Sequence, residues 1–190
     1  DIGTDHGYLP KRLIQENISP KVYAIDNKPG PLASAFENTK GIPGIILSLA
    51  NGIEQLNDDV TCVVLAGLGG RTIVDILVDI PFHIKHIITS PNVASALVRY
   101  HLVELGFKIK TEQVILEAGV YYELLHFIRG TATYELIDYE VGPMIKKDSS
   151  EIATNYRQKR VVELQTLLAT IPEHVAKHQE IQALIRLYQI

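Results

Sequence analysis

The 190-residue sequence contains no tryptophan, one methionine and one cysteine, Cys62. A single cysteine excludes a disulfide-stabilised scaffold and a cysteine-ligated zinc site, and it favours a reducing, cytoplasmic location. No apolar run approaches the ~20 residues of a transmembrane helix, and no secretory signal peptide is recognisable, so a membrane protein is not expected. The 18 basic and 22 acidic residues give a net charge of −4. This balance excludes a wholly basic nucleic-acid binder but allows a local basic face.

Several common catalytic motifs are missing as well. The sequence has no Walker phosphate-binding loop, no G-x-S-x-G nucleophile turn and no paired Cys and His nucleophile. The dinucleotide fingerprint G-x-G-x-x-G is also absent, because Gly3 and Gly7 stand four residues apart with the acidic Asp5 between them. The sequence therefore argues against a nicotinamide-dependent oxidoreductase.

The first two-thirds of the chain alternates short apolar runs with helical patterns, which is typical of α/β folds. The apolar runs are continuous, as expected for strands that helices cover on both faces. Two further strand-like runs, 108–116 and 121–128, are joined by a hairpin signal. We predict a Rossmann-like, doubly wound sheet that ends in an antiparallel hairpin. Its other strands are expected at 22–26, 45–47, 61–66 and 86–89, and its helices at 8–16, 31–40, 72–79 and 94–105.

The last quarter of the chain has a different pattern. The stretch 134–141 looks extended, and no strand is expected from Ser149 onward. Apolar residues then recur at heptad-like spacing in two series, 161–171 and 181–188, and Pro172 suits the first turn of the second helix. Two such helices should pair as an antiparallel, coiled-coil hairpin. We therefore expect a Rossmann-like domain at 1–145 and a helical hairpin at 146–190.

The first candidate site is the opening segment, Asp1-Ile2-Gly3-Thr4-Asp5-His6-Gly7, interpreted as the turn after a strand that begins before residue 1. Glycines after a buried strand let the backbone approach a ligand closely, and the next helix N-terminus favours polar or anionic groups. The carboxylates of Asp1 and Asp5 would repel a pyrophosphate but suit a ligand that carries an ammonium and a sulfonium group. S-adenosylmethionine is such a cofactor, and an ordinary glycine turn is the alternative.

Polar residues also end the next two predicted strands. Asp26 follows Gly7 by 19 residues, near the distance at which an acid accepts hydrogen bonds from ribose hydroxyls in Rossmann-like sites. Asn51, followed by Gly52, offers an amide that matches the donor and acceptor of an adenine edge. Taken singly, a cap or turn at Asp26 and an Asn-Gly turn are the structural alternatives.

Turns with special backbone chemistry follow the remaining strands. Residues 66–70, Ala-Gly-Leu-Gly-Gly, indicate a backbone that lies close to a ligand at the carboxyl end of the sheet. Pro91 fixes the backbone before Asn92, whose amide suits a base edge. The local sequence alone favours a simple helix cap for Asn92.

The remaining charged residues are less distinctive. Arg157, Lys159 and Arg160 fit a solvated helix face and a nucleic-acid contact equally well. Residues 149–190 carry five basic and four acidic side chains, so this segment is slightly basic. His174 and His178 are four residues apart and suit the solvated side of a helix. No histidine pair has a convincing metal-ligand spacing, and we expect no metal.

Taken in order, these segments resemble the bacterial tRNA (adenine-22) N1-methyltransferase family of class I S-adenosylmethionine-dependent methyltransferases. The resemblance spans nearly the whole chain, and its most specific part is the string Asp5-His6-x-Tyr8-Leu9-Pro10. The other matching segments are 30–32, 51–53, 66–70, Pro91–Asn92, Tyr122–Glu123 and Gly142–Pro143.

The resemblance implies S-adenosylmethionine as methyl donor and an adenine in the D arm of tRNA as acceptor. It implies a catalytic role for Asn92 on the substrate side. On the substrate side we expect contacts to tRNA from Pro91 and Tyr122, and the slightly basic helical hairpin leads us to expect further contacts from Arg157, Lys159 and Arg160. The resemblance implies cofactor contacts from Asp1, Gly3, Thr4, Asp5, His6, Gly7, Asp26, Asn51, Gly52, Ala66, Gly67, Leu68, Gly69 and Gly70.

The chain departs from the family pattern at three positions. Asp26 stands where the family usually has Glu, Asn51 where it has Asp, and Ser90 where it has Gln. Two alternatives therefore stay open: a class I methyltransferase with another substrate, whose helical hairpin serves dimerisation, and a relative that binds S-adenosylmethionine or RNA without turnover. The oligomeric state is open, with a monomer favoured.

Overall fold

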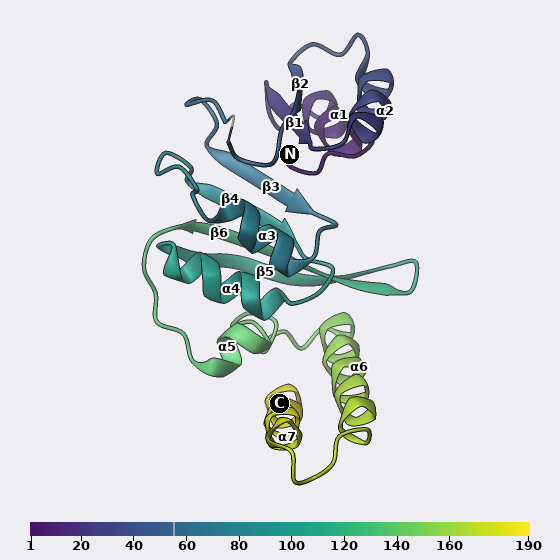
Figure 1. The fold of residues 1–190 in the computed structure, drawn as a ribbon, viewed down its shortest axis with the longest axis vertical. Helices are drawn as coiled ribbons and strands as arrows, with labels where there is room; N and C mark the ends of the chain where they lie inside the picture. The colour runs from purple at the N-terminus through teal and green to yellow at the C-terminus, as the bar shows by residue number, and fades with distance from the viewer. Residues whose placement is uncertain (55) are drawn as a thin grey trace. The chain divides into compact units, whose positions relative to one another are not determined.

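The computed structural model describes residues 1–54 and 56–190, which form two compact units, Asp1–Val93 and Ala94–Ile190 (Figure 1). Both units combine helices with strands. The first unit contains α1 (Tyr8–Gln15), β1 (Val22–Asp26), α2 (Pro29–Thr39), β2 (Ile45–Leu49), β3 (Cys62–Ala66), α3 (Gly70–Leu77) and β4 (His86–Ser90). The second contains α4 (Ser95–Glu104), β5 (Phe107–Glu117), β6 (Val120–Arg129), α5 (Leu136–Glu140), α6 (Glu151–Leu168) and α7 (Ala176–Tyr188).

The first unit is built on parallel strand pairs. β1 pairs with β2 and β3 pairs with β4, both in parallel. The opening segment lies between these pairs, because Ile2 forms a parallel bridge with Ile25 of β1 and donates its N–H to the Val64 carbonyl of β3 at 2.9 Å. The turn after Ile2 is therefore held beside the carboxyl end of β1.

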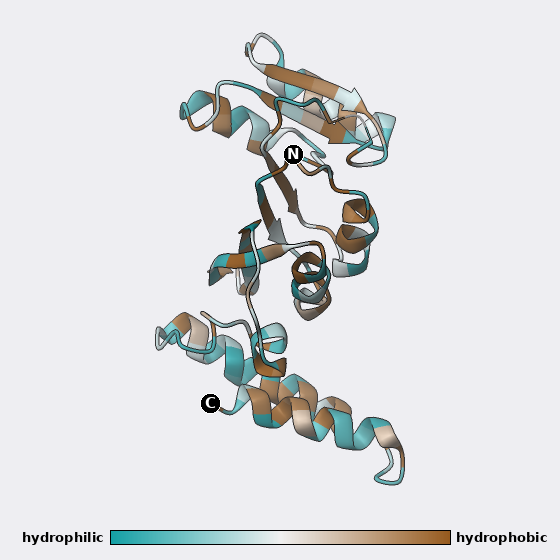
Figure 2. Ribbon diagram, turned by 90° about the vertical axis from the view of Figure 1, so that its left-hand side faces the viewer, coloured by the Kyte–Doolittle hydropathy of each residue, from teal (hydrophilic) through white to brown (hydrophobic). Residues whose placement is uncertain are grey.

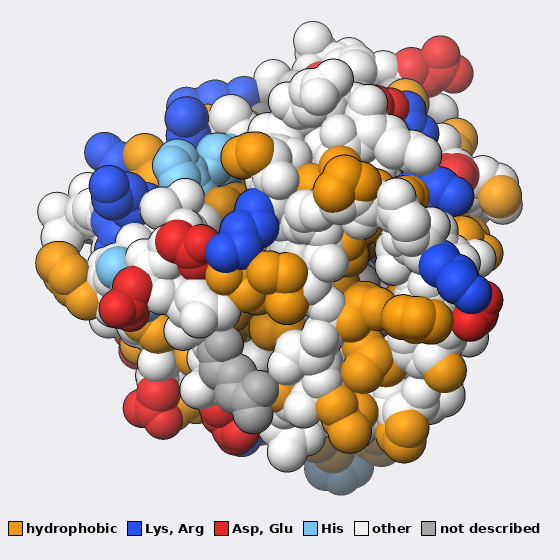
Figure 3. Space-filling model, turned by 90° about the horizontal axis from the view of Figure 1, so that it is seen from above, with side chains coloured by type: hydrophobic (Ala, Val, Ile, Leu, Met, Phe, Trp, Pro, Cys, Tyr) orange, Lys and Arg blue, Asp and Glu red, His pale blue; other side chains and the backbone are white. Residues whose placement is uncertain are grey.

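Apolar strand residues form the core of this unit. Ala24, Leu65 and Ile87 are fully buried in three different strands, and Ile73 and Leu77 of α3 are fully buried as well. Burial of each leucine or isoleucine side chain contributes about 1.5–3 kcal/mol, which explains why continuous apolar runs predicted these strands. Figure 2 shows hydrophobic residues (brown) along the strands, while Figure 3 shows that other hydrophobic side chains (orange) reach the surface among charged ones.

The predicted hairpin is confirmed in the second unit. β5 and β6 pair in antiparallel register from Phe107 opposite Arg129 to Glu117 opposite Val120. Both residues of the connecting turn are left-handed, with φ of 48° at Ala118 and 80° at Gly119. Two-residue turns of this kind match the twist of the flanking strands.

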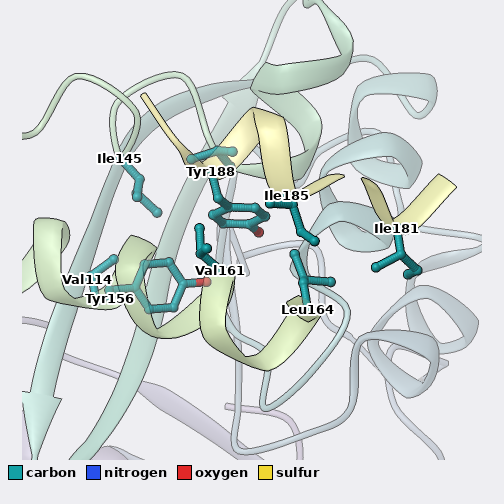
Figure 4. Packing of buried hydrophobic residues seen from close by; sticks show 9 residues of the cluster. Val114, Ile145, Tyr156, Val161, Leu164, Ile181, Ile185 and Tyr188 are labelled. Carbon is teal, nitrogen blue, oxygen red and sulfur yellow. The ribbon is translucent and has the colours of Figure 1, made fainter. Parts of the chain in front are cut away.

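The helical hairpin is also confirmed. α6 begins at a conventional cap, since the Ser150 hydroxyl oxygen accepts the Ala153 N–H at 3.3 Å. Val161 and Leu164 of α6 pack toward Ile185 and Tyr188 of α7, on the facing sides that the heptad-like spacing predicted (Figure 4). None of the helices in residues 1–54 and 56–190 is long and apolar enough to span a membrane.

Two local predictions are wrong. The stretch 134–141 contains a helix, α5, because Glu135 and Asp138 form a reciprocal capping box that starts a helical turn. Pro172 lies in the turn between the last helices, four residues before α7 begins, and its carbonyl accepts the Val175 N–H at 3.1 Å. The boundary at residue 145 stays a prediction, although α6 begins close to it.

Candidate functional site

The opening turn has a tightly constrained backbone. Gly3, Asp5 and Gly7 all have left-handed φ values, of 76°, 51° and 69°. A Cβ on Gly7 would lie 3.1 Å from the side chains of Ala35 and Thr39 in α2, so only glycine lets the turn approach that helix so closely. The turn is thereby fixed between the end of the opening segment and the start of α1.

Carboxylates organise both ends of this turn. The Thr4 hydroxyl donates to Asp1 Oδ2 at 2.6 Å. Asp26, at the end of β1, is buried, and its Oδ2 accepts the Asp5 N–H at 3.1 Å while its Oδ1 accepts the Lys28 N–H at 2.9 Å. Each carboxylate oxygen can accept two hydrogen bonds, so Asp26 can join the turn to β1 and still accept from a ligand.

The segment after β2 is hydrogen-bonded to Asp26. The Ala50 N–H donates to the Asp26 carbonyl at 3.0 Å, and the next residue, Asn51, is exposed. Gly52 is buried with φ of 106°, and a Cβ there would lie 2.9 Å from Ile76 of α3. The close approach explains the glycine, and it leaves the Asn51 amide at the surface beside the end of β1.

Asn92 joins the turn after β4 to the glycine loop after β3 through two of its own hydrogen bonds. The Asn92 N–H donates to the Leu68 carbonyl at 2.9 Å, and Asn92 Nδ2 donates to the Gly67 carbonyl at 2.7 Å. A carbonyl oxygen only accepts, so the amide nitrogen must face Gly67. Asn92 is therefore not the helix cap that the local sequence favoured. The N-cap of α4 is Ala94, and it makes no side-chain cap hydrogen bond.

The opening turn and the ends of β1, β2, β3 and β4 therefore form one cluster, which we call the strand-end cluster. Gly3 approaches the Leu68 side chain, where a Cβ would make contact at 3.4 Å, and Leu68 in turn binds Asn92. Pro91 is buried behind Asn92, whereas Ala66 and Gly67 are exposed. The cluster combines carboxylates, an amide on either side and an open backbone, which together could hold a polar ligand with a cationic part.

Pro91 belongs to the first unit, whereas the other four predicted tRNA contacts belong to the second, and their surroundings differ. Tyr122 is half-buried in β6, opposite Ile115. Arg157 is buried, and its Nη1 donates to the carbonyls of Ile145 at 2.6 Å and Asp148 at 2.8 Å. This guanidinium holds the segment that precedes α6.

The two neighbours of Arg157 are more accessible. Lys159 is exposed, with its Nζ 5.4 Å from the ring centre of Tyr121. Arg160 is partly exposed, pairs with Glu163 and lies over the ring of Tyr188 at 5.8 Å. In this basic cluster, Lys159 therefore has the cation with the fewest partners inside the protein.

Sequence reasoning missed a buried ionic network. Arg99 of α4 is fully buried, and its Nε donates to Glu112 at 2.6 Å while Nη2 donates to Glu123 and Nη1 to the Tyr139 carbonyl at 3.0 Å. The Tyr156 hydroxyl of α6 donates to Glu123 at 2.6 Å. The network thus joins α4, both strands of the hairpin and α6.

Two carboxylates share one cation in this network. Burial lowers the pKa of Arg99, but Glu123 and Glu112 outweigh burial and hold that pKa above its ordinary value. Burial raises the pKa of Glu112 even though Arg99 opposes the shift. The sequence signal was a single arginine within the apolar pattern of α4. Among the residues that the structure describes, no three His, Cys, Asp or Glu side chains gather as a metal site.

Comparison with known proteins assigns the chain to a family. A family model described as tRNA (adenine(22)-N(1))-methyltransferase matches residues 1–189. A Mycoplasma pneumoniae protein is 32% identical over 128 residues, which cover 66% of this chain and 60% of that relative. The chain therefore spans less than two-thirds of the length of this curated relative.

Solved structures agree with this assignment. A Streptococcus agalactiae protein of the NADB-Rossmann superfamily is 26% identical, with a TM-score of 0.92 over 99% of this chain and 87% of its own. The M. capricolum TrmK protein in complex with S-adenosylhomocysteine is 29% identical, with a TM-score of 0.87 over the same shares of the two chains. The predicted Rossmann-like fold is confirmed, and the chain belongs to the tRNA (adenine(22)-N(1))-methyltransferase family.

Proposed function

We propose that this protein transfers the methyl group of S-adenosylmethionine to N1 of adenine 22 in the D arm of bacterial tRNA. The observation that carries the proposal is the match of the family model to residues 1–189, together with the clustering of the candidate residues of the first unit. A tRNA substrate also implies that the protein works in the cytoplasm.

The strand-end cluster suits the proposed cofactor. S-adenosylmethionine, when bound, supplies a methyl group that its sulfonium centre has already activated. Asp1 and Asp5 provide negative charge for the ammonium and sulfonium groups, and Asp26 retains accepting capacity for ribose hydroxyls. The exposed Asn51 amide would offer a donor and an acceptor to the adenine ring, and the open backbone at Gly67 would let the cofactor approach this loop closely.

The proposed methyl transfer requires correct orientation of the adenine more than it requires acid–base catalysis. Adenine N1 carries an in-plane lone pair, so no general base has to act before attack, and positioning can supply about 7–11 kcal/mol of the barrier reduction. Because N1 lies on the pairing edge, the adenine must leave the stack to react. Asn92 Nδ2 already donates to Gly67, which directs Oδ1 away from that carbonyl. Oδ1 can then accept from the exocyclic amine while N1 stays free.

One assay tests the function directly. The protein is incubated with labelled S-adenosylmethionine and homologous tRNA, and the digested nucleosides are analysed for 1-methyladenosine. Labelled 1-methyladenosine that disappears when adenine 22 of the tRNA is replaced by guanosine supports the proposal, and another labelled nucleoside or acceptor points to a methyltransferase with a different substrate. Cofactor binding by calorimetry without any methylated product points to the non-catalytic alternative.

The role of Asn92 can be tested separately. Asn92→Ala should lower the methylation rate about tenfold or more, because the adenine edge loses its acceptor. Affinity for S-adenosylmethionine, measured by calorimetry, should stay within about twofold. The matched control is Asn57→Ala, which removes an exposed amide outside the cluster and should leave the rate unchanged. A rate for Asn92→Ala within a few-fold of wild type would show that Asn92 does not hold the adenine.

A further inference from the structure

Two aromatic rings reach the surface next to the proposed cofactor turn. Tyr8, the first residue of α1, is 66% exposed. The His6 side chain is 48% exposed, and the centres of the two rings are 5.5 Å apart at an interplanar angle of 35°. The rings therefore form a small apolar surface that water covers in the free protein.

The place of these rings distinguishes them from scattered surface aromatics. They flank Gly7, within the turn that begins at Gly3, and Gly3 approaches Leu68, which binds Asn92. Val93, the residue after Asn92, is also 66% exposed. Exposed apolar side chains therefore lie next to two parts of the strand-end cluster: Tyr8 follows the opening turn, and Val93 follows Asn92.

The chemistry proposed above needs such a surface. An adenine that leaves the tRNA helix loses its stacking partners, which costs a few kcal/mol. A protein ring that takes the place of a neighbouring base regains about 1–3 kcal/mol. Stacking engages the face of the base, so the pairing edge with N1 stays available.

We infer that Tyr8, backed by His6, stacks on the target adenine after it leaves the tRNA helix. The inference rests on the proposed function and assigns to Tyr8 a contact with the substrate base. Tyr8 contributes its ring face, and Asn92 contributes the hydrogen bond at the edge. The two residues would then fix the plane of the base and its rotation within that plane.

Two substitutions separate the ring from its hydroxyl group. Tyr8→Ala should lower kcat/KM for tRNA by about five- to a hundredfold, the equivalent of one lost stacking contact. Tyr8→Phe keeps the ring and should stay within about twofold of wild type. Calorimetry should give both variants the wild-type affinity for S-adenosylmethionine. Phe82→Ala is the matched control, since Phe82 is 90% exposed but precedes β4, at the opposite end of that strand from Asn92.

Fluorescence gives a readout that a purely structural role would not change. With 2-aminopurine at the target position of the tRNA, an aromatic ring stacked on the base quenches its emission. The complex with Tyr8→Ala should therefore be brighter than the complexes with wild type and Tyr8→Phe.

Three results would overturn the inference: a kcat/KM for Tyr8→Ala within twofold of wild type, an equal loss in Tyr8→Phe, or a parallel loss of cofactor affinity. Failure of the proposed function has a different signature, namely a wild-type protein that forms no 1-methyladenosine. In that case, equal emission from the Tyr8→Ala and Tyr8→Phe complexes would still refute the stacking contact.

Discussion

The two compact units use their polar side chains in opposite ways. At the strand ends of the first unit, Asn51 and Asn92 are exposed, and the carboxylate of Asp26 retains free accepting capacity. In the second unit, Arg99 and Glu112 are buried and bind each other. One unit therefore keeps polar groups available for ligands, and the other uses them to hold its own elements together.

This difference distinguishes polar residues that are available to bind ligands from polar residues that stabilise the fold. The first unit takes its stability from apolar strands such as β1 and β3, so its turns are free to carry chemistry. The second unit attaches a long helical hairpin to a two-stranded hairpin, and Tyr156 and Arg157 supply hydrogen bonds at that junction. Substitutions in the two units should consequently affect different measurements.

The largest expected effect is on the stability of the second unit. Arg99→Ala leaves two buried carboxylates without their cation, which should lower the free energy of unfolding by about 3–5 kcal/mol. Urea unfolding followed by circular dichroism measures this change. The control is Arg71→Ala, because Arg71 pairs with Asp75 on an exposed face of α3, where an ion pair contributes little.

The outcome tests whether the network is structural. If Arg99→Ala unfolds at the same urea concentration as Arg71→Ala, then the buried ion pairs do not stabilise the unit. A large loss in both variants would contradict the distinction between buried and exposed pairs.

A smaller effect is expected in the first unit, on binding instead of stability. Asp26→Asn replaces an acceptor by a donor that must face either the Asp5 or the Lys28 N–H, and it removes the charge near the ribose hydroxyls. The dissociation constant for S-adenosylmethionine should rise about ten- to a hundredfold, as measured by calorimetry. Asp26→Glu restores the carboxylate and should bind within a few-fold of wild type.

The control for Asp26 is another carboxylate of the same unit. Asp59 is exposed and pairs with Lys21 at 2.8 Å, outside the strand-end cluster, so Asp59→Asn should leave cofactor affinity unchanged. Equal affinities of Asp26→Asn and Asp59→Asn for S-adenosylmethionine would show that Asp26 does not bind the cofactor.

Most of the fold could be predicted from the sequence where one physical signal dominated. The apolar runs at 22–26 and 86–89 form β1 and β4 almost residue for residue, because most of the side chains in these runs are buried. The prediction failed at 134–141, where the capping box of Glu135 and Asp138 outweighed an extended-looking pattern. Local hydrogen bonds of this kind leave only a weak trace in hydrophobic periodicity.

Prediction of the sites depended on how far apart the partners lie in the sequence. The glycine turns and strand-end residues were recognisable, since each follows its own strand directly. The Arg99 network was not, because its partners come from β5, β6 and α6. The burial of Arg157 could have been predicted from the sequence. The apolar series of α6, extended backwards from Val161 in steps of four, reaches Arg157 and the buried Ala153.

The smallest expected effect distinguishes two neighbouring cations of α6. Lys159 is exposed, so Lys159→Ala should leave the unfolding free energy unchanged, weaken tRNA binding slightly and reduce the slope of log affinity against log salt by about one. Arg157→Ala should instead lower the stability, because the carbonyls of Ile145 and Asp148 lose their donor. Filter binding across a salt series and urea unfolding measure the two properties. An unchanged salt slope in Lys159→Ala would mean that this face of α6 does not contact tRNA.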